Sequence, residues 1–380
     1  MEKPRAIKPE ESDAAIKLIN RVFRNGAGLA STMQYEYPVL LSLKNCENRR
    51  AIFDNGEPVA CLNIYKANLN LFGHEICMAF IGAVATHPDY RRRGLAGSLI
   101  EDAEEKMMLE GVDAIVISGN YDIYTSRGYT FVHKYKQFII NQSIAGNAVD
   151  VEEAVPDAEL IHKILPLYLR EPVRFYRSFN DYLGLYKGSV YEWGETTYKS
   201  FLIKRDGYLQ GSFILRIDTS GKAGSIVEWV GDRQAILDGI KAVYRDYGLN
   251  EISAVVSPWD EQIVHLFEKD GLQAVPSLCG HTLKVVNFEK LMGKVSAYAD
   301  EILDNSAAGR LSGSEQDGKF IIKLGKKTVI ETKDIRDINL LLFGNGPENA
   351  DYAEYAAKYG DLLKDVFPLP LPYLYNLNHI

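Results

Sequence analysis

The chain has 380 residues, of which 46% are hydrophobic and 25% charged, and its formal net charge is −8. This length predicts two or three globular domains, and the acidic balance argues against general nucleic-acid binding, which needs a broad basic surface. The charged start of the chain lacks the apolar core of a signal peptide, and no apolar run approaches the roughly 18 residues of a membrane span, so we expect a cytoplasmic protein without a membrane partner.

The first region, residues 1–145, opens with helical patterns. Residues 9–23 place apolar side chains on one broad helical face, with acidic residues in the first turn. Residues 31–43 predict a second helix, interrupted at Pro38. The tripeptide Asp54-Asn55-Gly56 lies between two strand-like runs and therefore predicts a β-hairpin.

Two buried strands with a helix between them follow. Residues 75–86 and 113–119 are apolar runs of strand length. The intervening helix carries Leu99, Ala103 and Met107 on one face, and Gly111 is its expected C-terminal cap.

The second region, residues 146–285, repeats this order with little sequence identity. Residues 144–157 have the loose composition of a linker, and helices are expected over about 157–170 and 172–186. Strands flank the turn Asp206-Gly207, after which strand and helix patterns alternate. We interpret this as an internal repeat of architecture.

The third region starts at residue 286. It predicts a helix over 287–303, an antiparallel hairpin around Gly325-Lys326, and helical segments over 334–344 and 351–367. The final residues, PLPLPYLYNLNHI, are rich in proline and apolar side chains, so we expect the tail to lie extended against the protein.

The stretch HPDYRRRGLAGSLI (87–100) places positive charge where a strand runs through a turn into a helix. A helix N-terminus offers unpaired N–H groups and partial positive charge, and small residues let a pyrophosphate reach that backbone. A solvated basic loop before a glycine helix start is the alternative, and the stretch alone does not decide between them.

The surrounding residues resemble the GNAT acetyltransferase superfamily. The resemblance rests on R-x-x-G-x-A (Arg91, Gly94, Ala96) after a strand and on Y-x-x-x-G-Y (Tyr124, Gly128, Tyr129) after the next strand. It implies that acetyl-CoA is the co-substrate and that the pantetheine arm pairs with the end of the first strand. The implied coenzyme contacts are Val84, Ala85, Thr86, Arg91, Arg92, Arg93, Gly94, Leu95, Ala96, Gly97, Gly119 and Asn120.

The whole chain resembles the Eis (enhanced intracellular survival) type of acetyltransferase. This implies an α+β (mixed α/β) fold: a catalytic GNAT domain over 1–145, a degenerate GNAT-like domain over 146–285, and a sterol carrier protein-like domain over 286–380. The second region reads GDRQAILDG where the first has its arginines, so an aspartate follows the glycine. We therefore expect no coenzyme site there.

Acid and base roles are expected at opposite ends of the chain. Tyr124 matches the family's general-acid tyrosine, with core packing as the alternative in a chain of 23 tyrosines. The strand before the loop has no carboxylate, and the Eis resemblance implies that the C-terminal carboxylate of Ile380 is the base. His87 and His379 are rival bases.

The acceptor is expected to be a primary amine. Tyr35 and Glu36 can supply an aromatic wall and a carboxylate for a cation, although an amphipathic helix with packed tyrosines explains them equally. The resemblance implies an aminoglycoside, polyamine or lysine-type acceptor and a homo-oligomer. The competing interpretation is a catalytically inactive carrier of acyl-CoA or lipid.

Cysteine and histidine usage predicts no metal site. The four cysteines form no CxxC pair, and the seven histidines form no HExxH. We expect reduced thiols at Cys46, Cys61, Cys77 and Cys279.

Overall fold

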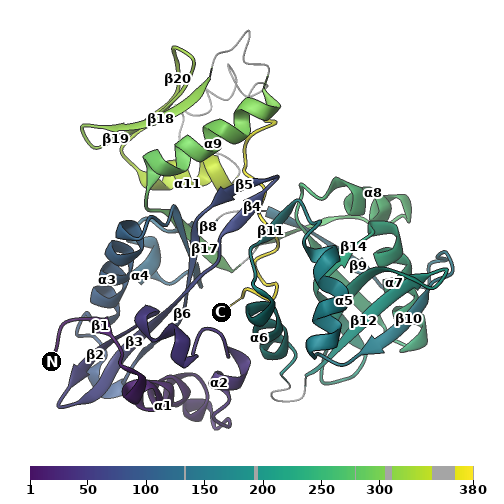
Figure 1. Cartoon of the computed structure of the whole chain (residues 1–380), viewed down its shortest axis with the longest axis horizontal. Helices are drawn as coiled ribbons and strands as arrows, with labels where there is room; N and C mark the ends of the chain where they lie inside the picture. The colour runs from purple at the N-terminus through teal and green to yellow at the C-terminus, as the bar shows by residue number, and fades with distance from the viewer. Residues whose placement is uncertain (132–133, 192–195, 279, 304–309, 345–363, 380) are drawn as a thin grey trace. The chain divides into compact units, whose positions relative to one another are not determined.

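The computed structural model describes residues 1–131, 134–191, 196–278, 280–303, 310–344 and 364–379 (Figure 1). Their contacts form two compact units. The first unit takes the chain up to residue 133 and again from 280 to 370, and the second takes residues 134–279 and 371–379. Along the chain, the second unit is thus inserted into the first.

The first unit is built on one mixed sheet. Its strand order is β1-β2-β3-β6-β7-β17-β8, and among its described pairs only β6 and β7 run parallel. The β2–β3 hairpin turns at Asn55-Gly56, as predicted. The strands are β1 (Arg5–Ala6), β2 (Arg49–Asp54), β3 (Glu57–Lys66), β6 (Met78–Thr86), β7 (Ala114–Ser118), β8 (Thr130–Phe131) and β17 (His281–Val285).

Helices α1 (Ser12–Phe23) and α3 (Leu95–Leu109) cover opposite faces of this sheet. Leu62 and Ile64 of β3 pack in one apolar cluster with α3. The intervening Asn63 accepts a hydrogen bond from Arg49 Nε (3.3 Å), and Arg49 Nη1 donates to Ser12 Oγ of α1 (2.6 Å). Successive strand residues face opposite sides of a sheet, so both faces of β3 are covered.

The C-terminal part of the first unit adds a small antiparallel sheet and, among the residues described there, two helices. The predicted turn at Gly325-Lys326 joins two of its strands. Asn339 ties the second of these helices to the main sheet, because its Nδ2 donates to Leu283 O (3.1 Å) and its Oδ1 accepts from Val285 N (2.9 Å). The elements are α9 (Phe288–Ile302), β18 (Leu311–Gln316), β19 (Lys319–Leu324), β20 (Lys327–Thr332) and α11 (Ile335–Phe343), besides the hairpin β4 (Leu69–Leu71) and β5 (His74–Ile76).

The second unit repeats the pattern of one mixed sheet with a single parallel pair. The order is β10-β12-β13-β14-β15-β9-β16, and β14 runs parallel to β15 among the described pairs. Helix α7 (Arg233–Asp246) packs on β12 and β13, and α5 (Ala158–Tyr168) on β13 and β14. The strands are β9 (Lys134–Ile140), β10 (Asp150–Ala154), β12 (Thr197–Arg205), β13 (Tyr208–Ile217), β14 (Ala223–Gly231), β15 (Glu251–Val256) and β16 (Val275–Leu278); α6 (Phe179–Ser189) and α8 (Glu261–Lys269) complete it.

The secondary structure corrects three predictions. The helix expected over 31–43 is only one turn, α2 (Met33–Glu36), followed by a 3₁₀ segment from Leu43 to Asn48. The helix expected from 172 begins at Phe179, and Ser178 is its N-cap. A short strand, β11 (Val173–Phe175), precedes it, and the residues of this strand alternate between buried and partly buried. The expected linker contains β10, which pairs with β12.

The predicted helix over 351–367 lies mainly outside the described residues, which omit 345–363. The predicted division at 145/146 and 285/286 stays a prediction. The strands nearest those boundaries pair across them: β9 joins the second unit's sheet and β17 the first unit's sheet.

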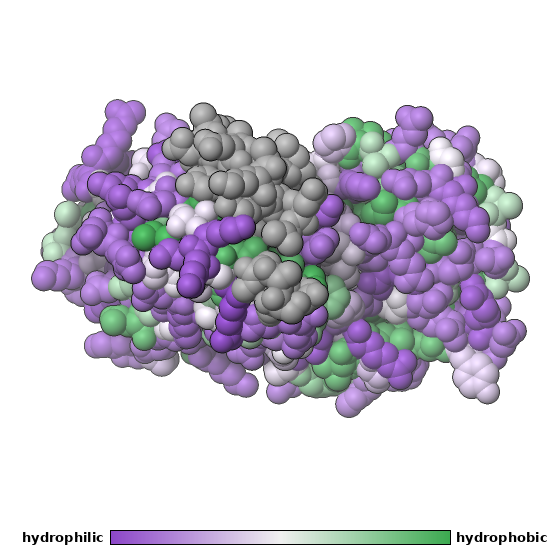
Figure 2. All heavy atoms as spheres, turned by 90° about the horizontal axis from the view of Figure 1, so that it is seen from above, coloured by the Kyte–Doolittle hydropathy of each residue, from purple (hydrophilic) through white to green (hydrophobic). Residues whose placement is uncertain are grey.

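Figure 2 shows one face of the molecule, on which hydrophilic side chains predominate and hydrophobic ones form small patches. Within the described ranges, no helix has the length and apolar character needed to cross a bilayer.

Candidate active site

An opening between β6 and β7 is the first feature of the site. The two strands pair from Met78↔Ala114 to Ile81↔Ile117, but β6 continues to Thr86. The register of β6 against β3 shifts where Ala83 has a φ of 48°, which is the mark of a β-bulge. The last residues of β6 therefore extend beyond the part of the strand that β7 covers.

The end of β7 turns toward β17 instead. Gly119 N donates to Gly280 O (2.8 Å), and Thr282 Oγ1 donates to Gly119 O (3.1 Å). Gly119 has a φ of 116°, which L side chains rarely adopt. The glycine conformation and the bonds to β17 explain why the two parallel strands separate here.

The loop from β6 to α3 keeps its three arginines exposed. Tyr90 anchors the loop because its hydroxyl donates to Asp54 Oδ2 (2.8 Å), and the Arg93 guanidinium lies 4.7 Å from the Tyr90 ring centre. Arg91 Nε donates to Thr86 O (3.4 Å). Arg92 has a φ of 62°, so its backbone lies in the left-handed region. The loop thus presents positive charge at the start of α3.

Gly94 begins α3 in a left-handed conformation, with a φ of 77°, and no side chain caps the helix. A Cβ placed on Gly94 would meet no atom within 4 Å, so the space beside it is open. The first N–H groups of a helix have no intrahelical acceptor, and they carry partial positive charge. This helix start is therefore suited to an anion such as a pyrophosphate.

Gly97, in the first turn of α3, leaves space for a side chain that the sequence pattern does not indicate. A Cβ on Gly97 would lie 2.6 Å from Arg127 Nη2. Arg127 is held by Glu101 Oε1 (3.0 Å) and by Ile123 O (3.1 Å). The signal in the sequence is only the pair Arg127-Gly128, which no local pattern connects to the loop.

Tyr124 lies on the one-turn helix α4 (Asp122–Thr125) beyond β7 and is buried, with 6% exposure. Its ring packs edge-on against Tyr121 (6.0 Å between ring centres) and Tyr129 (6.4 Å). A Cβ on Gly119 would lie 3.7 Å from the Tyr124 ring, which places the ring at the end of β7. Burial, with a smaller contribution from Tyr121, raises the pKa of Tyr124 to about 12. The phenol therefore keeps its proton at neutral pH.

The two predicted acceptor residues have different surroundings. Tyr35 is 54% exposed, whereas Glu36 is buried. Glu36 forms an ion pair with Arg24 and accepts from Thr32 Oγ1 (2.5 Å). Its negative charge is therefore already compensated within the first unit, and its acceptor role stays a prediction.

Of the three predicted bases, His87, His379 and the carboxylate of Ile380, the first two lie in different surroundings. Nδ1 of His87 accepts a hydrogen bond from Asp89 N (3.3 Å) in the loop before α3. Burial, and to a lesser extent Arg216, lowers the pKa of His379 to about 4, which makes it a weak base. Ile380 lies outside the described residues.

The second unit has a comparable opening. Strands β14 and β15 pair only from Ala223↔Glu251 to Ser225↔Ser253, while β14 continues to Gly231. The helix that follows, α7, is capped by Asp232, whose carboxylate accepts from Ala235 N (2.8 Å). Its first residue, Arg233, is bound by Glu171 Oε2 (2.6 Å) and Asp260 Oδ2 (2.9 Å). One backbone donor at this helix start is thus satisfied by a carboxylate, and the Arg233 side chain is held by two others.

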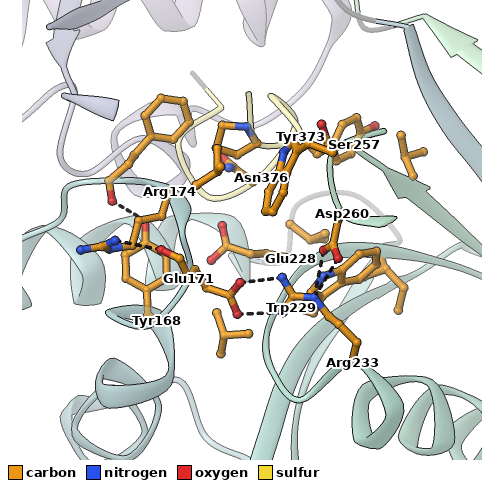
Figure 3. Close-up of a pocket in the computed structure, with 18 residues that line it drawn as sticks. Tyr168, Glu171, Arg174, Glu228, Trp229, Arg233, Ser257, Asp260, Tyr373 and Asn376 are labelled. Atoms are coloured by element: carbon orange, nitrogen blue, oxygen red, sulfur yellow. Dashed lines mark hydrogen bonds and ion pairs between the residues drawn. The ribbon is translucent and has the colours of Figure 1, made fainter. Parts of the chain in front are cut away.

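The C-terminal segment lines this second opening (Figure 3). Leu371 O accepts from Ser257 Oγ (2.8 Å) and from Trp259 Nε1 (3.0 Å). Tyr373 and Trp229 are among the residues around the cavity that remains, which has a volume of about 80 Å³. Figure 3 also shows, as dashed lines, the contacts of Arg233 with Glu171 and Asp260.

A buried arginine holds the rest of this segment. Arg177 Nε donates to Asn378 Oδ1 (2.8 Å), and its guanidinium forms two bonds to Glu228 (2.7 and 2.8 Å). The same guanidinium lies over the rings of Tyr168 (4.6 Å) and Tyr182 (5.0 Å). The described tail is therefore docked rather than free, as the sequence predicted.

Comparison with protein families is informative for the first part of the chain. Residues 3–132 match the sequence profile of the acetyltransferase (GNAT) domain. This segment holds the β6–β7 opening, the arginine loop and Tyr124. No curated protein sequence is significantly similar to the chain.

The similarity to solved structures covers nearly the whole chain. A GCN5-related N-acetyltransferase from Anabaena variabilis has 17% identity and a TM-score of 0.64, covering 98% of this chain and 97% of its own. A conserved protein of Enterococcus faecalis, described as a probable N-acyltransferase, has 15% identity and a TM-score of 0.67, with coverage of 98% and 97%. Eis1 from Mycobacterium abscessus has 16% identity and a TM-score of 0.58, covering 88% of this chain and 86% of its own. At these identities the similarity concerns the fold.

Proposed function

Because residues 3–132 are an acetyltransferase (GNAT) domain and the chain is an acyltransferase, we propose that it transfers acetyl from acetyl-CoA to a primary amine by direct attack. The observation that carries this proposal is the uncapped start of α3 at Gly94, beside strands that separate and a buried Tyr124.

The residues of the loop fit the coenzyme. Open space at Gly94 and the exposed side chains of Arg91, Arg92 and Arg93 would hold the pyrophosphate. Val84, Ala85 and Thr86 are the proposed backbone partners of the pantetheine arm. When bound, acetyl-CoA supplies an activated thioester.

Tyr124 is the proposed general acid. The thiol of CoA has a pKa of about 8.5 by analogy with cysteine, which is below the pKa of about 12 of Tyr124. In water, the phenol would therefore donate a hydrogen bond to the departing thiolate without transferring its proton fully. Burial disfavours the charged thiolate and so raises the pKa of the thiol, which brings it closer to the pKa of Tyr124 and favours proton transfer.

The proposed base is the C-terminal carboxylate of Ile380. Two observations support it: β6 carries no carboxylate, and the preceding residues 371–379 are anchored through Arg177 and Asn378. An α-carboxylate with a pKa near 3.5 is a weak base in water, so this role requires desolvation or an intervening water.

The acceptor class is proposed on the Eis resemblance. Aminoglycosides, polyamines and lysine side chains are the candidates, and Tyr35 with Glu36 is the proposed aromatic and acidic contact. We also propose that the protein forms a homo-oligomer.

The test is thiol release from acetyl-CoA in the presence of aminoglycosides, polyamines and lysine peptides, with an untagged C-terminus. We expect release that depends on the amine. Binding of acetyl-CoA without release on any amine would instead favour the carrier interpretation.

A further inference from the structure

One cysteine of the first unit lies against a lysine from a distant part of the chain. Cys77 links β5 to β6, and Lys294 lies on α9. Lys294 Nζ is 3.2 Å from Cys77 Sγ, although the two residues are 217 positions apart. Cys77 Sγ also lies 3.9 Å from Glu75 Oε1.

A buried carboxylate fixes both partners of this pair. Asp113 Oδ2 accepts from Cys77 N (2.7 Å) and from Lys294 Nζ (2.5 Å), and the Asp113 side chain is fully buried. Burial alone would lower the pKa of Lys294, but its hydrogen bonds to Asp113 and Cys77 raise it. The ammonium is therefore held at the sulfur and does not sample solvent freely.

The other described cysteines lack this arrangement. Cys46 and Cys61 are buried, whereas Cys77 is partly exposed. Burial raises the pKa of Cys61 to about 12, which makes that thiol inert. Among the cysteines that the structure describes, Cys77 alone combines solvent access with an amine in contact.

We propose that Cys77 and Lys294 form a covalent sulfur–nitrogen bridge when the protein meets a peroxide. The Cys77 thiolate attacks hydrogen peroxide, the O–O bond breaks, and the products are a sulfenic acid and hydroxide. Asp113 takes one proton from the Lys294 ammonium and passes it to solvent. The neutral Nζ then attacks the sulfenic sulfur and displaces its hydroxyl group, and the second proton lost from Nζ converts the leaving hydroxide to water. Sulfur is oxidised by two electrons and the peroxide is reduced.

The bridge would join the start of β6 to α9. It fixes the C-terminal part of the first unit to the sheet that carries the coenzyme loop. This chemistry does not depend on the proposed amine acetylation.

The test is treatment of the full-length protein with hydrogen peroxide, followed by proteolysis and mass spectrometry. We expect one joined species that contains the peptides of Cys77 and Lys294, has lost two hydrogens, and separates on treatment with a thiol reductant. Oxidised Cys77 with an unmodified Lys294, or an unoxidised Cys77, would overturn the proposal.

Two variants serve as controls. Lys294→Arg keeps a cation beside Asp113 but removes the amine nucleophile, so Cys77 should be oxidised without forming the bridge. Cys77→Ser should give no joined species. A joined species that persists in either variant would also overturn the proposal, and thermal unfolding of the untreated variants verifies that they fold.

Discussion

The two strand openings share one chain order but present different groups to a ligand. In the first unit, α3 begins at Gly94 with no side-chain cap and three arginines beside it. In the second unit, Asp232 caps α7, and Arg233 is bound by Glu171 and Asp260. A tyrosine follows the first opening, whereas the C-terminal segment lines the second.

Under the proposed function, the shared fold alone does not make an anion site. Such a site needs backbone donors that no side chain has satisfied. A carboxylate at the cap position both satisfies one donor and repels an anion. The second opening instead takes a peptide segment, whose Leu371 carbonyl bonds to Ser257 and Trp259.

The largest effect is expected from removing the group that only the first opening has. Tyr124→Phe should lower kcat by about 100-fold or more, because general-acid catalysis contributes that order of magnitude, and should leave acetyl-CoA affinity unchanged. Tyr121→Phe, at an exposed neighbour, should keep kcat within about twofold. Since the pKa of Tyr124 is about 12, loss of its proton should not reduce kcat below about pH 10. Equal turnover in both variants would remove Tyr124 as the acid.

The second prediction makes the first helix start resemble the second. Gly94→Glu should weaken coenzyme binding by about 100-fold, because the added side chain occupies the open space at the helix start and its negative charge repels the pyrophosphate, at a cost of about 3 kcal/mol. Gly318→Glu is a matched control, since Gly318 has a φ of 68°, lies in a hairpin, and has equally open space. Calorimetric titration with CoA measures both. If Gly94→Glu binds like the control, the loop is not the pyrophosphate site.

The third prediction concerns the segment in the second opening. Folded His379 has a pKa of about 4, whereas the unfolded chain binds a proton near 6.5. Between about pH 4 and pH 6.5 the unfolded state therefore binds more protons than the folded state. The free energy of unfolding is thus highest above about pH 6.5 and falls as the pH is lowered. We expect a loss of about 1–2 kcal/mol by pH 5 in urea unfolding followed by tryptophan fluorescence. His379→Gln should flatten this dependence, and an unchanged slope would exclude His379 as its source.

The smallest effect is expected from uncapping α7. Asp232→Ala should lower the free energy of unfolding by about 1 kcal/mol, the usual value of an N-terminal cap. It should not create a second coenzyme site, because Arg233 remains bound by two carboxylates and no arginine loop precedes the helix. Titration should still give one coenzyme per chain. Two bound coenzymes would mean that the cap alone separates the two openings.

Sequence patterns predicted the local secondary structure around α3 well. Gly94 is the N-cap of α3 as expected, whereas Gly111, expected as the C-cap, lies one residue beyond the C-cap Glu110 in a left-handed conformation. The strands on either side of α3 follow continuous apolar runs. The helix predicted over residues 31–43 was too long. Their apolar spacing continues past Pro38, but the helix ends at Glu36, because proline disfavours a helical conformation in the residue before it.

Contacts between distant segments could not be predicted in this way. No periodicity indicates that Thr282 lies beside Gly119, or that Arg127 uses the space left by Gly97. The anchoring of the tail was expected from its apolar composition, but Arg177 was not identified, because a buried arginine gives no local signal.

The insertion of β17 beside β7 has a consequence for synthesis on the ribosome. Thr282 follows Gly119 by 163 positions, and at 5–20 residues per second this separation takes roughly 10–30 s. During that interval the nascent first sheet has an unpaired edge, while the inserted unit can already acquire nearly all of its strands. The main sheet of the first unit is thus completed late, and a shortened chain that ends near residue 145 would lack the strand that covers β7.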